Sequence, residues 1–229
     1  MNEETVTLAR SDADGYEIAL RRRFQDDQVI DELIVNGAFT MDSAHTSSEI
    51  ALAEALGPNP GTVLVGGLGL GFTAEHLLAM GAKHLDIVEH SGQLIEWANQ
   101  ALTPTLGQIA ADPRVTIHQG DVAALLRAQP ALPGLFGPWD SICLDTDNGP
   151  EFLIHESNAA LYTMAGIQAM LEHLTPGGKL AIWSQGASKE FWFDISSIDK
   201  DATEQLIPVD QTHRKMDYAI YTLHRHDNS

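Results

Sequence analysis

The chain has a single cysteine, Cys143, among 229 residues. One cysteine excludes an internal disulfide framework and a zinc site built from several thiolates, so we expect a cytoplasmic setting. No apolar run approaches the roughly 18 residues that a membrane helix needs, and the polar, acidic N-terminus carries no apolar leader segment. We therefore expect no membrane association.

Basic side chains are scarce. The 13 Lys and Arg residues stand against 32 Asp and Glu, which gives a formal net charge of −19. A nucleic-acid-binding protein needs a basic stripe, so nucleic acid is excluded as a partner. The one basic run, residues 21–23, is expected to be a solvated face, with an anion site as the minor alternative. The acidic excess is compatible with a cationic substrate such as a polyamine, although a solubilising acidic surface is the preferred explanation.

Three catalytic motifs are missing. No Gly-x-x-x-x-Gly-Lys-Ser/Thr segment is present, which excludes a P-loop. The ten histidines show no His-Glu-x-x-His spacing, so we expect no metal site. Ser141 lies inside a predicted strand without a Gly-x-Ser-x-Gly turn, and a hydrolase of that type is not expected.

The most informative stretch that is present covers residues 62–92. Its apolar runs predict a strand, a glycine turn, a helix and a second strand, with alternating Gly67, Gly69 and Gly71 in the turn. Glycines let the backbone approach a ligand closely. Glu89 ends the second strand about 20 residues later, where a carboxylate can accept hydrogen bonds from ribose hydroxyls. The Gly-x-Gly-x-Gly spacing favours an adenosine without pyrophosphate, such as S-adenosylmethionine; a turn without a ligand is the alternative.

Alternating strands and helices follow, and they predict a Rossmann-like α/β fold with a mostly parallel sheet and helices on both faces. Before them, Asn36-Gly37 between apolar runs predicts a β-hairpin in a small meander. We expect a β appendage over residues 1–45 and a cofactor-binding, catalytic domain over residues 46–229. The expected strands are 16–24 (at an edge), a hairpin at 32–41, 63–65, 85–89, 115–118, 141–144, 179–183 and 218–223; the expected helices are 46–56, 73–80, 94–102, 122–128 and 159–174, with an insertion at 184–195.

Acidic residues end three of the predicted strands. Glu89, Asp121 and the pair Asp145 and Asp147 stand at these ends. Ligands of open α/β sheets bind outside the carboxyl ends of the strands. We therefore expect Glu89, Asp121 and Asp145 to join the three glycines in binding the cofactor, and Asp145 and Asp147 to be catalytic.

This order of motifs resembles the spermidine synthase (aminopropyltransferase) family, which shares the fold of the class I S-adenosylmethionine-dependent methyltransferases. The resemblance implies that Glu89 binds the ribose, that Asp121 meets the adenine amino group and that Asp145 lies in the catalytic strand. It also implies a decarboxylated S-adenosylmethionine co-substrate, an amine or polyamine acceptor and a homodimer. The resemblance covers about residues 30–185, and its matching segments are 63–71, 87–89, 112–115, 120–121, 140–145, 149–150 and 174–178.

Several positions depart from the family pattern. In the family an aspartate of the glycine motif holds the aminopropyl amine, a Tyr-His pair lines the amine pocket, a glutamine lies near the hairpin, and two loop aspartates stand three residues apart. The first three positions carry Leu70, Leu52-Ala53 and Thr40, and the two aspartates, 145 and 147, are two residues apart. The changes at Leu70 and Leu52-Ala53 favour a methyltransferase that uses intact S-adenosylmethionine. The overall architecture, with its β appendage and the Gly149-Pro150 loop, favours aminopropyl transfer.

Both reactions are attacks by a nucleophile on a carbon attached to a positive sulfur, which needs no metal. An amine near pKa 10 arrives protonated, and a neighbouring carboxylate can bind it and accept a proton. Our first hypothesis is aminopropyl transfer to an amine; the alternatives are a methyltransferase, a non-catalytic adenosine- or polyamine-binding module and, more weakly, a nicotinamide dehydrogenase. His90 is a candidate neighbour of the ribose, and Trp183 and Trp192 serve packing or a cation–π contact.

Overall fold

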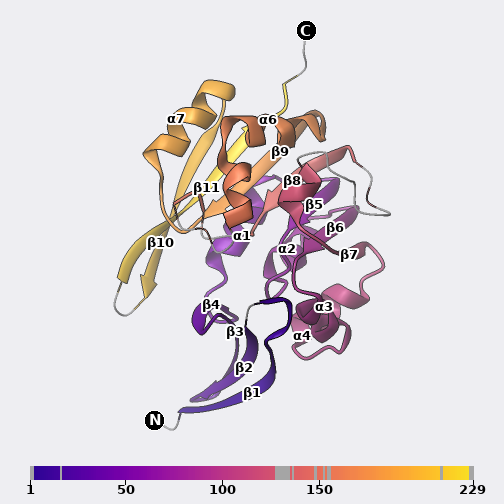
Figure 1. Ribbon diagram of the computed structural model, residues 1–229, viewed down its shortest axis with the longest axis vertical. Helices are drawn as coiled ribbons and strands as arrows, with labels where there is room; N and C mark the ends of the chain where they lie inside the picture. Colours follow the sequence, from indigo (N-terminus) through magenta and orange to yellow (C-terminus); the bar gives the residue numbers. More distant parts are fainter. Residues whose placement is uncertain are drawn as a thin grey trace.

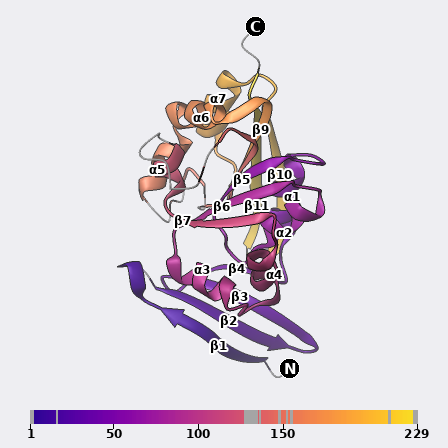
Figure 2. The same cartoon turned by 90° about the vertical axis from the view of Figure 1, so that its right-hand side faces the viewer.

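Two β-sheets organise the chain in the computed structural model, which describes residues 3–15, 17–126, 135, 137–146, 149–151, 153, 156–211 and 214–226 (Figure 1). The four-stranded sheet has the order β1-β2-β3-β4, and the seven-stranded sheet has the order β10-β11-β9-β8-β5-β6-β7. Figure 2 shows the four-stranded sheet as a separate layer at one end of the molecule. This arrangement confirms the expected α/β fold with an added N-terminal β-structure, while the division into domains at residue 45 stays a prediction.

The N-terminal sheet is an antiparallel meander. The predicted hairpin is confirmed, since Asn36 and Gly37 have positive φ values of 51° and 74° and join two paired strands. The strand predicted at the edge over residues 16–24 lies inside the sheet instead, because an additional strand pairs with its outer side. That strand was missed because its sequence is largely polar and its side chains are mostly exposed. The strands are β1 (Glu3–Ser11), β2 (Ile18–Gln25), β3 (Gln28–Val35) and β4 (Ala38–Asp42).

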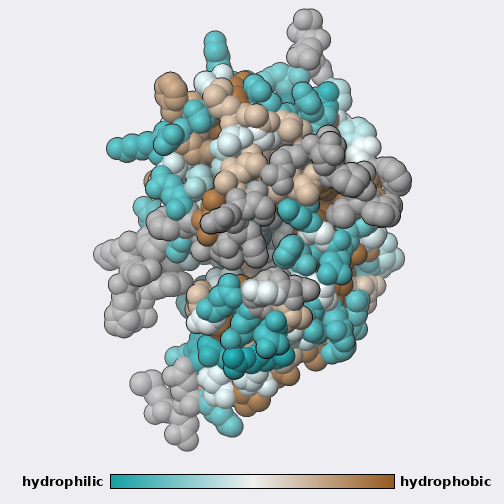
Figure 3. Space-filling model, in the orientation of Figure 1, coloured by the Kyte–Doolittle hydropathy of each residue, from teal (hydrophilic) through white to brown (hydrophobic). Residues whose placement is uncertain are grey.

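The basic run on β2 is paired with acids of β3, not simply solvated as the sequence suggested. Arg22 binds Asp31 through two hydrogen bonds of 2.7 and 3.1 Å. Arg21 and Arg23 both contact Glu32, at 3.1 and 2.7 Å. Figure 3 shows hydrophilic side chains gathered on this face over the N-terminal sheet. Because these guanidinium groups already bind carboxylates, an anion site at this run has no support.

The seven-stranded sheet is parallel except at one edge. β5 pairs in parallel with β6 and β8, and those strands pair in parallel with β7 and β9. β11 runs antiparallel to both β9 and β10. The chain fills one side of β5 first and then crosses to the other, so the carboxyl ends of β5 and β8 border a topological switch point. The strands are β5 (Thr62–Gly66), β6 (His84–Glu89), β7 (Val115–Gln119), β8 (Trp139–Leu144), β9 (Leu174–Ser184), β10 (Thr203–Gln211) and β11 (Arg214–His224).

Helices cover both faces of this sheet, as predicted. Successive residues of β5 point to opposite faces, so Val63 and Val65 lie in one hydrophobic core and Leu64 lies in the other. The first core includes residues of α1 to α4, and the second includes residues of α5 to α7. The helices are α1 (Ser47–Ala55), α2 (Phe72–Ala79), α3 (Gly92–Asn99), α4 (Pro104–Ala111), α5 (Val122–Leu126), α6 (Met164–Glu172) and α7 (Lys189–Ile198), with short 3₁₀ segments η1 (Ala13–Gly15) and η2 (Glu156–Tyr162).

The helix predictions need three corrections. The insertion expected at 184–195 includes the beginning of α7, which continues to Ile198, and α4 was missed entirely. The single helix expected over 159–174 is η2 followed by α6, because Thr163 breaks the run and caps α6 through Gly166 N–H at 3.1 Å. The residue before α1 is Thr46, and it makes no side-chain capping bond. No helix in the described part of the chain has the length and apolar character to cross a membrane.

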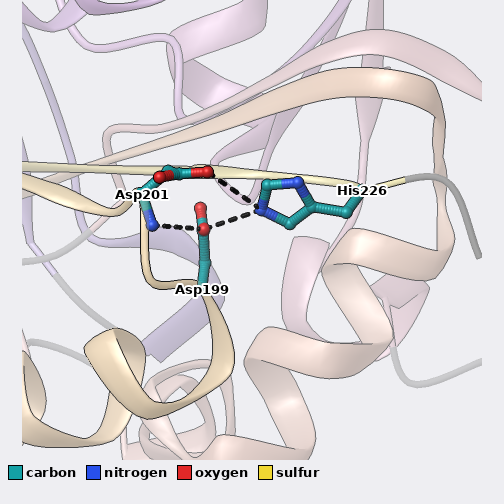
Figure 4. Close-up of side chains that lie close together, drawn as sticks. All are labelled: Asp199, Asp201 and His226. Carbon is teal, nitrogen blue, oxygen red and sulfur yellow. Dashed lines mark hydrogen bonds and ion pairs between the residues drawn. The ribbon is translucent and has the colours of Figure 1, made fainter.

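A buried carboxylate, Asp199, ties the end of α7 to the end of β11. It is 1% exposed and accepts hydrogen bonds from the backbone N–H groups of Asp201 and His224, both at 2.8 Å. The imidazole of His226 lies 2.8 Å from the same carboxylate (Figure 4). The imidazole of His224 lies 3.1 Å from it. Burial of Asp199 acts to raise its pKa, but these hydrogen bonds outweigh burial and lower the pKa of Asp199. The same hydrogen bond to Asp199 raises the pKa of His226.

We expect Asp199→Ala to lower the free energy of unfolding by about 1–3 kcal/mol at pH 6, because it removes the buried acceptor of two backbone N–H groups and two imidazoles. Since the pKa of His226 is raised, its stabilising contribution is complete below the imidazole's ordinary pKa of 6.5 and is lost as the pH rises through the folded-state value. The difference between the variant and the wild type should therefore shrink between pH 6 and pH 9, as measured by urea denaturation.

The control is Asp201→Ala, which keeps the backbone N–H and removes a side chain that is 76% exposed. It should change stability by no more than about 0.5 kcal/mol. Equal losses in the two variants would show that Asp199 does not anchor this end of the chain.

Candidate functional site

A cavity of about 180 Å³ lies where the N-terminal sheet meets the carboxyl ends of the parallel strands. β2, β3 and β4 supply its apolar wall, including Ile18, Leu33 and Met41. The opposite wall is formed by the segments that follow β5, β6, β7 and β8, together with Trp183 near the end of β9. The position is the one at which open α/β sheets bind their ligands.

The glycine turn after β5 brings two strand ends into close contact. Gly67 has a φ of +93°, and a Cβ atom there would lie 2.2 Å from the backbone oxygen of Asp145. Gly69, with a φ of +51°, passes close to the Met41 side chain of β4. Both glycines line the cavity, whereas Gly71 begins α2 and packs against Ile109 of α4. Two of the three predicted cofactor-binding glycines are therefore in the cavity wall, and the third supports the turn.

Glu89 ends β6 with a carboxylate fixed by backbone donors. Its two oxygens accept hydrogen bonds from the N–H groups of Leu68 at 2.9 Å and Ser91 at 2.7 Å. Burial raises the pKa of Glu89, and these donors act in the opposite direction. The residue lines the cavity and links the glycine turn to the start of α3.

Asp121 follows β7 and begins α5. Its Oδ1 atom accepts hydrogen bonds from the N–H groups of Ala123 and Ala124, at 2.8 and 3.3 Å. Such a cap holds the carboxylate in place through the free amides of the first helical turn. Asp121 lines the cavity beside Gly120, on the same side as Glu89.

Asp145 follows β8 and has an unusual acidity. Thr73 of α2 donates a hydrogen bond to its carboxylate at 2.9 Å. Burial, and then the nearby charge of Glu49, raise the pKa of Asp145 to about 7. Thr146 also lines the cavity, and its buried hydroxyl has no hydrogen-bond partner among the described residues. The second predicted catalytic acid, Asp147, lies outside the described residues.

Sequence reasoning missed Glu49 as a cavity residue. It lies in the first turn of α1, is 6% exposed and lines the cavity. Ser48 Oγ donates a hydrogen bond to its Oε2 atom at 2.7 Å. Burial is the main cause of a raised pKa at Glu49. The available signal was an acid near the start of an otherwise apolar helix directly before the glycine-bearing strand.

The departures at Leu70 and Leu52-Ala53 have a different meaning in three dimensions. These side chains are at most 1% exposed, belong to the hydrophobic core and are not among the residues that line the cavity. The positions that do face it from the same two segments are Gly67, Gly69 and Glu49. The glycine turn therefore brings no carboxylate to the cavity, but α1 does. Thr40 lines the cavity, so that departure does alter its wall.

The electrostatic character of the cavity is strongly acidic. Among the described residues its wall contains no Lys or Arg, and His90 is the one imidazole. Trp183 adds an aromatic surface, with its ring 4.9 Å from that of Tyr218. Trp192 packs against the second core instead. A cationic ligand fits such a wall, because four acidic side chains face the same space: Glu49, Glu89, Asp121 and Asp145.

Outside the cavity, one group of side chains among the described residues has the spacing of a metal site. The ligand atoms of Asp199, Asp201 and His226 lie within 4.8 Å of one another, outside the cavity wall. Backbone and imidazole nitrogens already surround the Asp199 carboxylate, which accounts for the cluster without an ion. The expectation that the chain holds no metal stays a prediction.

Comparisons with known proteins agree with this geometry. No protein-family model matches the chain. A polyamine aminopropyltransferase of Corynebacterium efficiens is 29% identical over 182 residues, which cover 77% of this chain and 34% of that protein. Putrescine N-methyltransferase 3 of Nicotiana tabacum is 30% identical over 168 residues, which cover 68% of this chain and 41% of that protein. The chain thus spans between a third and a half of these two relatives.

Solved structures extend the similarity over nearly the whole chain. A spermidine synthase in complex with the transition-state analogue AdoDATO has a TM-score of 0.77 at 20% identity, covering 96% of this chain and 73% of that one. The spermidine synthase of Thermotoga maritima has a TM-score of 0.71, also at 20% identity, covering 96% and 72%.

The fold is that of spermidine synthase, with a mostly parallel seven-stranded sheet and an N-terminal four-stranded antiparallel sheet. In sequence, the chain is distantly similar to a polyamine aminopropyltransferase and to putrescine N-methyltransferases. Its homologues include aminopropyltransferases and putrescine methyltransferases, both of which are transferases.

We expect Gly67→Ala to lower the free energy of unfolding by about 1–3 kcal/mol more than Gly177→Ala does, because its methyl group would overlap the Asp145 backbone oxygen. Gly177 is the matched control, since it also has a positive φ, of +76°, but its Cβ would meet nothing within 4 Å. The control itself should lose about 1–2 kcal/mol from left-handed strain. Urea denaturation measures both, and equal losses would contradict the close approach of β5 and β8.

Proposed function

We propose that the chain is a transferase that moves an aminopropyl group from decarboxylated S-adenosylmethionine to an amine or polyamine. The observation that carries the proposal is the cavity wall at the strand ends, with four acidic side chains and no Lys or Arg among the described residues. Both reacting partners are cations, a sulfonium and an ammonium, and an acidic wall attracts each of them. Similarity to a polyamine aminopropyltransferase in sequence and to spermidine synthase in fold supports the same chemistry.

Three groups are placed to hold the nucleoside. Glu89 ends the second parallel strand, where a carboxylate accepts hydrogen bonds from ribose hydroxyls. Burial raises the pKa of Glu89, and its backbone bonds to Leu68 and Ser91 oppose that rise and orient the carboxylate. Asp121 is the proposed partner of the adenine amino group. Gly67 and Gly69 let the backbone approach the ligand, because neither carries a side chain into the cavity.

Asp145 is the proposed general base. With a pKa raised to about 7 it is partly ionised at neutral pH and can accept a proton from the ammonium as the nitrogen attacks. A C–N bond then forms, the C–S bond breaks, the electron pair of that bond stays on sulfur as a neutral thioether, and the proton resides on Asp145. The cavity walls hold the two partners in line. A catalytic role of Asp147 stays a prediction.

A methyltransferase is the second candidate, and two observations favour it. The glycine turn brings no carboxylate to the cavity to hold the amine of an aminopropyl group, since Gly69 and not an acid faces it. Several relatives at 29–30% identity are putrescine N-methyltransferases. The step is the same displacement at sulfur, with a methyl carbon in place of the aminopropyl carbon. A homodimer and a cytoplasmic location stay predictions.

Calorimetric titration separates these candidates. We expect decarboxylated S-adenosylmethionine to bind more tightly than the intact form, and mass spectrometry to detect an aminopropylated product with putrescine or spermidine. A preference for the intact form, with a methylated product, would replace the first candidate by the second. Binding without any product indicates a non-catalytic module, and binding of neither form would contradict both transferases.

Asp121→Asn should weaken nucleoside binding by about 10–100-fold, because a hydrogen bond to a charged acceptor is lost. The asparagine keeps an oxygen for the N–H groups of Ala123 and Ala124, so the fold should persist. The matched control is Glu96→Gln, on the exposed side of α3, which should leave the affinity unchanged. Equal affinities of the two variants would remove Asp121 from the binding site.

A further inference from the structure

Glu49 carries a buried charge that no described cation balances. It is 6% exposed, and no Lys, Arg or His in the described part of the chain forms an ion pair with it. The Ser48 hydroxyl is a neutral donor, and it satisfies one oxygen at 2.7 Å without neutralising the charge. A buried, unpaired carboxylate is costly, and it becomes favourable when a cation with hydrogen-bond donors meets it.

Two further acids lie near Glu49, and one of them, Asp42, also contacts His45 at 3.0 Å and Arg23 at 3.8 Å. Besides burial, the charge of Asp42, at the end of β4, raises the pKa of Glu49. Besides burial, the charge of Glu49 raises the pKa of Asp145, which follows β8. Burial is the main cause of a raised pKa at Tyr218 of β11, and the negative charges of Glu49 and Asp42 add to it. Glu49 and Asp145 therefore bring acidic groups to this corner of the cavity from two separate elements.

We propose that Glu49 is a substrate-binding residue that holds the ammonium group of the acceptor amine beside Asp145. This inference rests on the proposed function and specifies its amine subsite. An ammonium group has three N–H donors. The cavity offers three acceptors for them, the carboxylates of Glu49 and Asp145 and the hydroxyl of Thr146, which has no described partner. A primary amine is therefore the class of acceptor that this corner fits.

A purely structural role for Glu49 is the competing explanation. An acid in the first turn of a helix stabilises the helix dipole, and this effect needs neither a cavity nor a substrate. The two roles differ in what they do to Asp145. The charge of Glu49 disfavours ionisation of Asp145, whereas a helix-stabilising acid need not affect it.

The pH dependence of catalysis reports this coupling. Asp145 must be ionised to act as a base, so kcat/KM rises with pH through its pKa. The groups around it are Thr73 on α2, Glu89 and His90 after β6, Asp121 after β7, and Glu49 on α1. Apart from burial, Glu49 is the charge that raises the pKa of Asp145. Removing that charge lowers the pKa, and the acidic limb of the profile moves to lower pH.

The test compares Glu49→Gln with the wild type, using putrescine as the amine. We expect the KM for the amine to rise by about 10–100-fold, because a charge-assisted hydrogen bond is lost. The calorimetric affinity for the nucleoside co-substrate should stay unchanged, and the acidic limb of kcat/KM should move to lower pH. The control is Glu54→Gln on the same helix, whose side chain is 63% exposed and faces His76; it should match the wild type in all three measurements.

The proposal is overturned when Glu49→Gln keeps the KM and the pH profile of the wild type. Should Glu49→Gln fail to fold, Glu49→Asp keeps the charge and shortens the reach by one methylene, so the amine KM rises while the pH limb stays in place. An unchanged KM in that variant overturns the proposal as well. Failure of the proposed function has a different signature, because the wild type itself then transfers no group. Amine titration of the wild type and Glu49→Gln still decides the subsite, since equal affinities overturn it.

Discussion

The structure depends on the close approach of two strand ends, where the glycine turn after β5 passes against the backbone of Asp145 after β8. A side chain at Gly67 would overlap the Asp145 backbone oxygen, so this contact requires glycine. The contact places Asp145 at the switch point of the sheet, in the cavity that Glu89 also lines. The N-terminal sheet supplies the facing apolar wall, so a row of strand-end acids lines a partly buried, acidic cavity.

Burial and charge together account for the chemistry that the site can perform. In water an aspartate is fully ionised at neutral pH and is a weak base. Burial and a neighbouring carboxylate bring the pKa of Asp145 to about 7, where proton transfer from an ammonium is practical. Glu89 is also buried, but hydrogen bonds from two backbone N–H groups oppose the rise in pKa that burial causes. The same fold thus separates one acid for binding from one for proton transfer.

Much of the fold and of the nucleoside side of the cavity could be predicted from sequence, because the signals are local. Asn36-Gly37, the alternating glycines and an acid at each strand end are each visible within a few residues. The amine side could not be predicted in this way. Whether position 49, 52 or 70 faces the cavity depends on how α1 and the glycine turn pack, and neighbouring residues alternate between core and cavity. β1 and α4 were missed for a related reason, since neighbouring elements hold them more than their own apolar pattern does.

The most direct test of the account is a crystal structure of the chain with decarboxylated S-adenosylmethionine. We expect the ribose hydroxyls within hydrogen-bond distance of Glu89 and the adenine amino group at Asp121. We also expect the aminopropyl carbon to be directed toward Asp145. A nucleoside bound away from the glycine turn, or bound there with its sulfonium facing away from Asp145, would contradict the central claim that this acidic cavity is the site of group transfer.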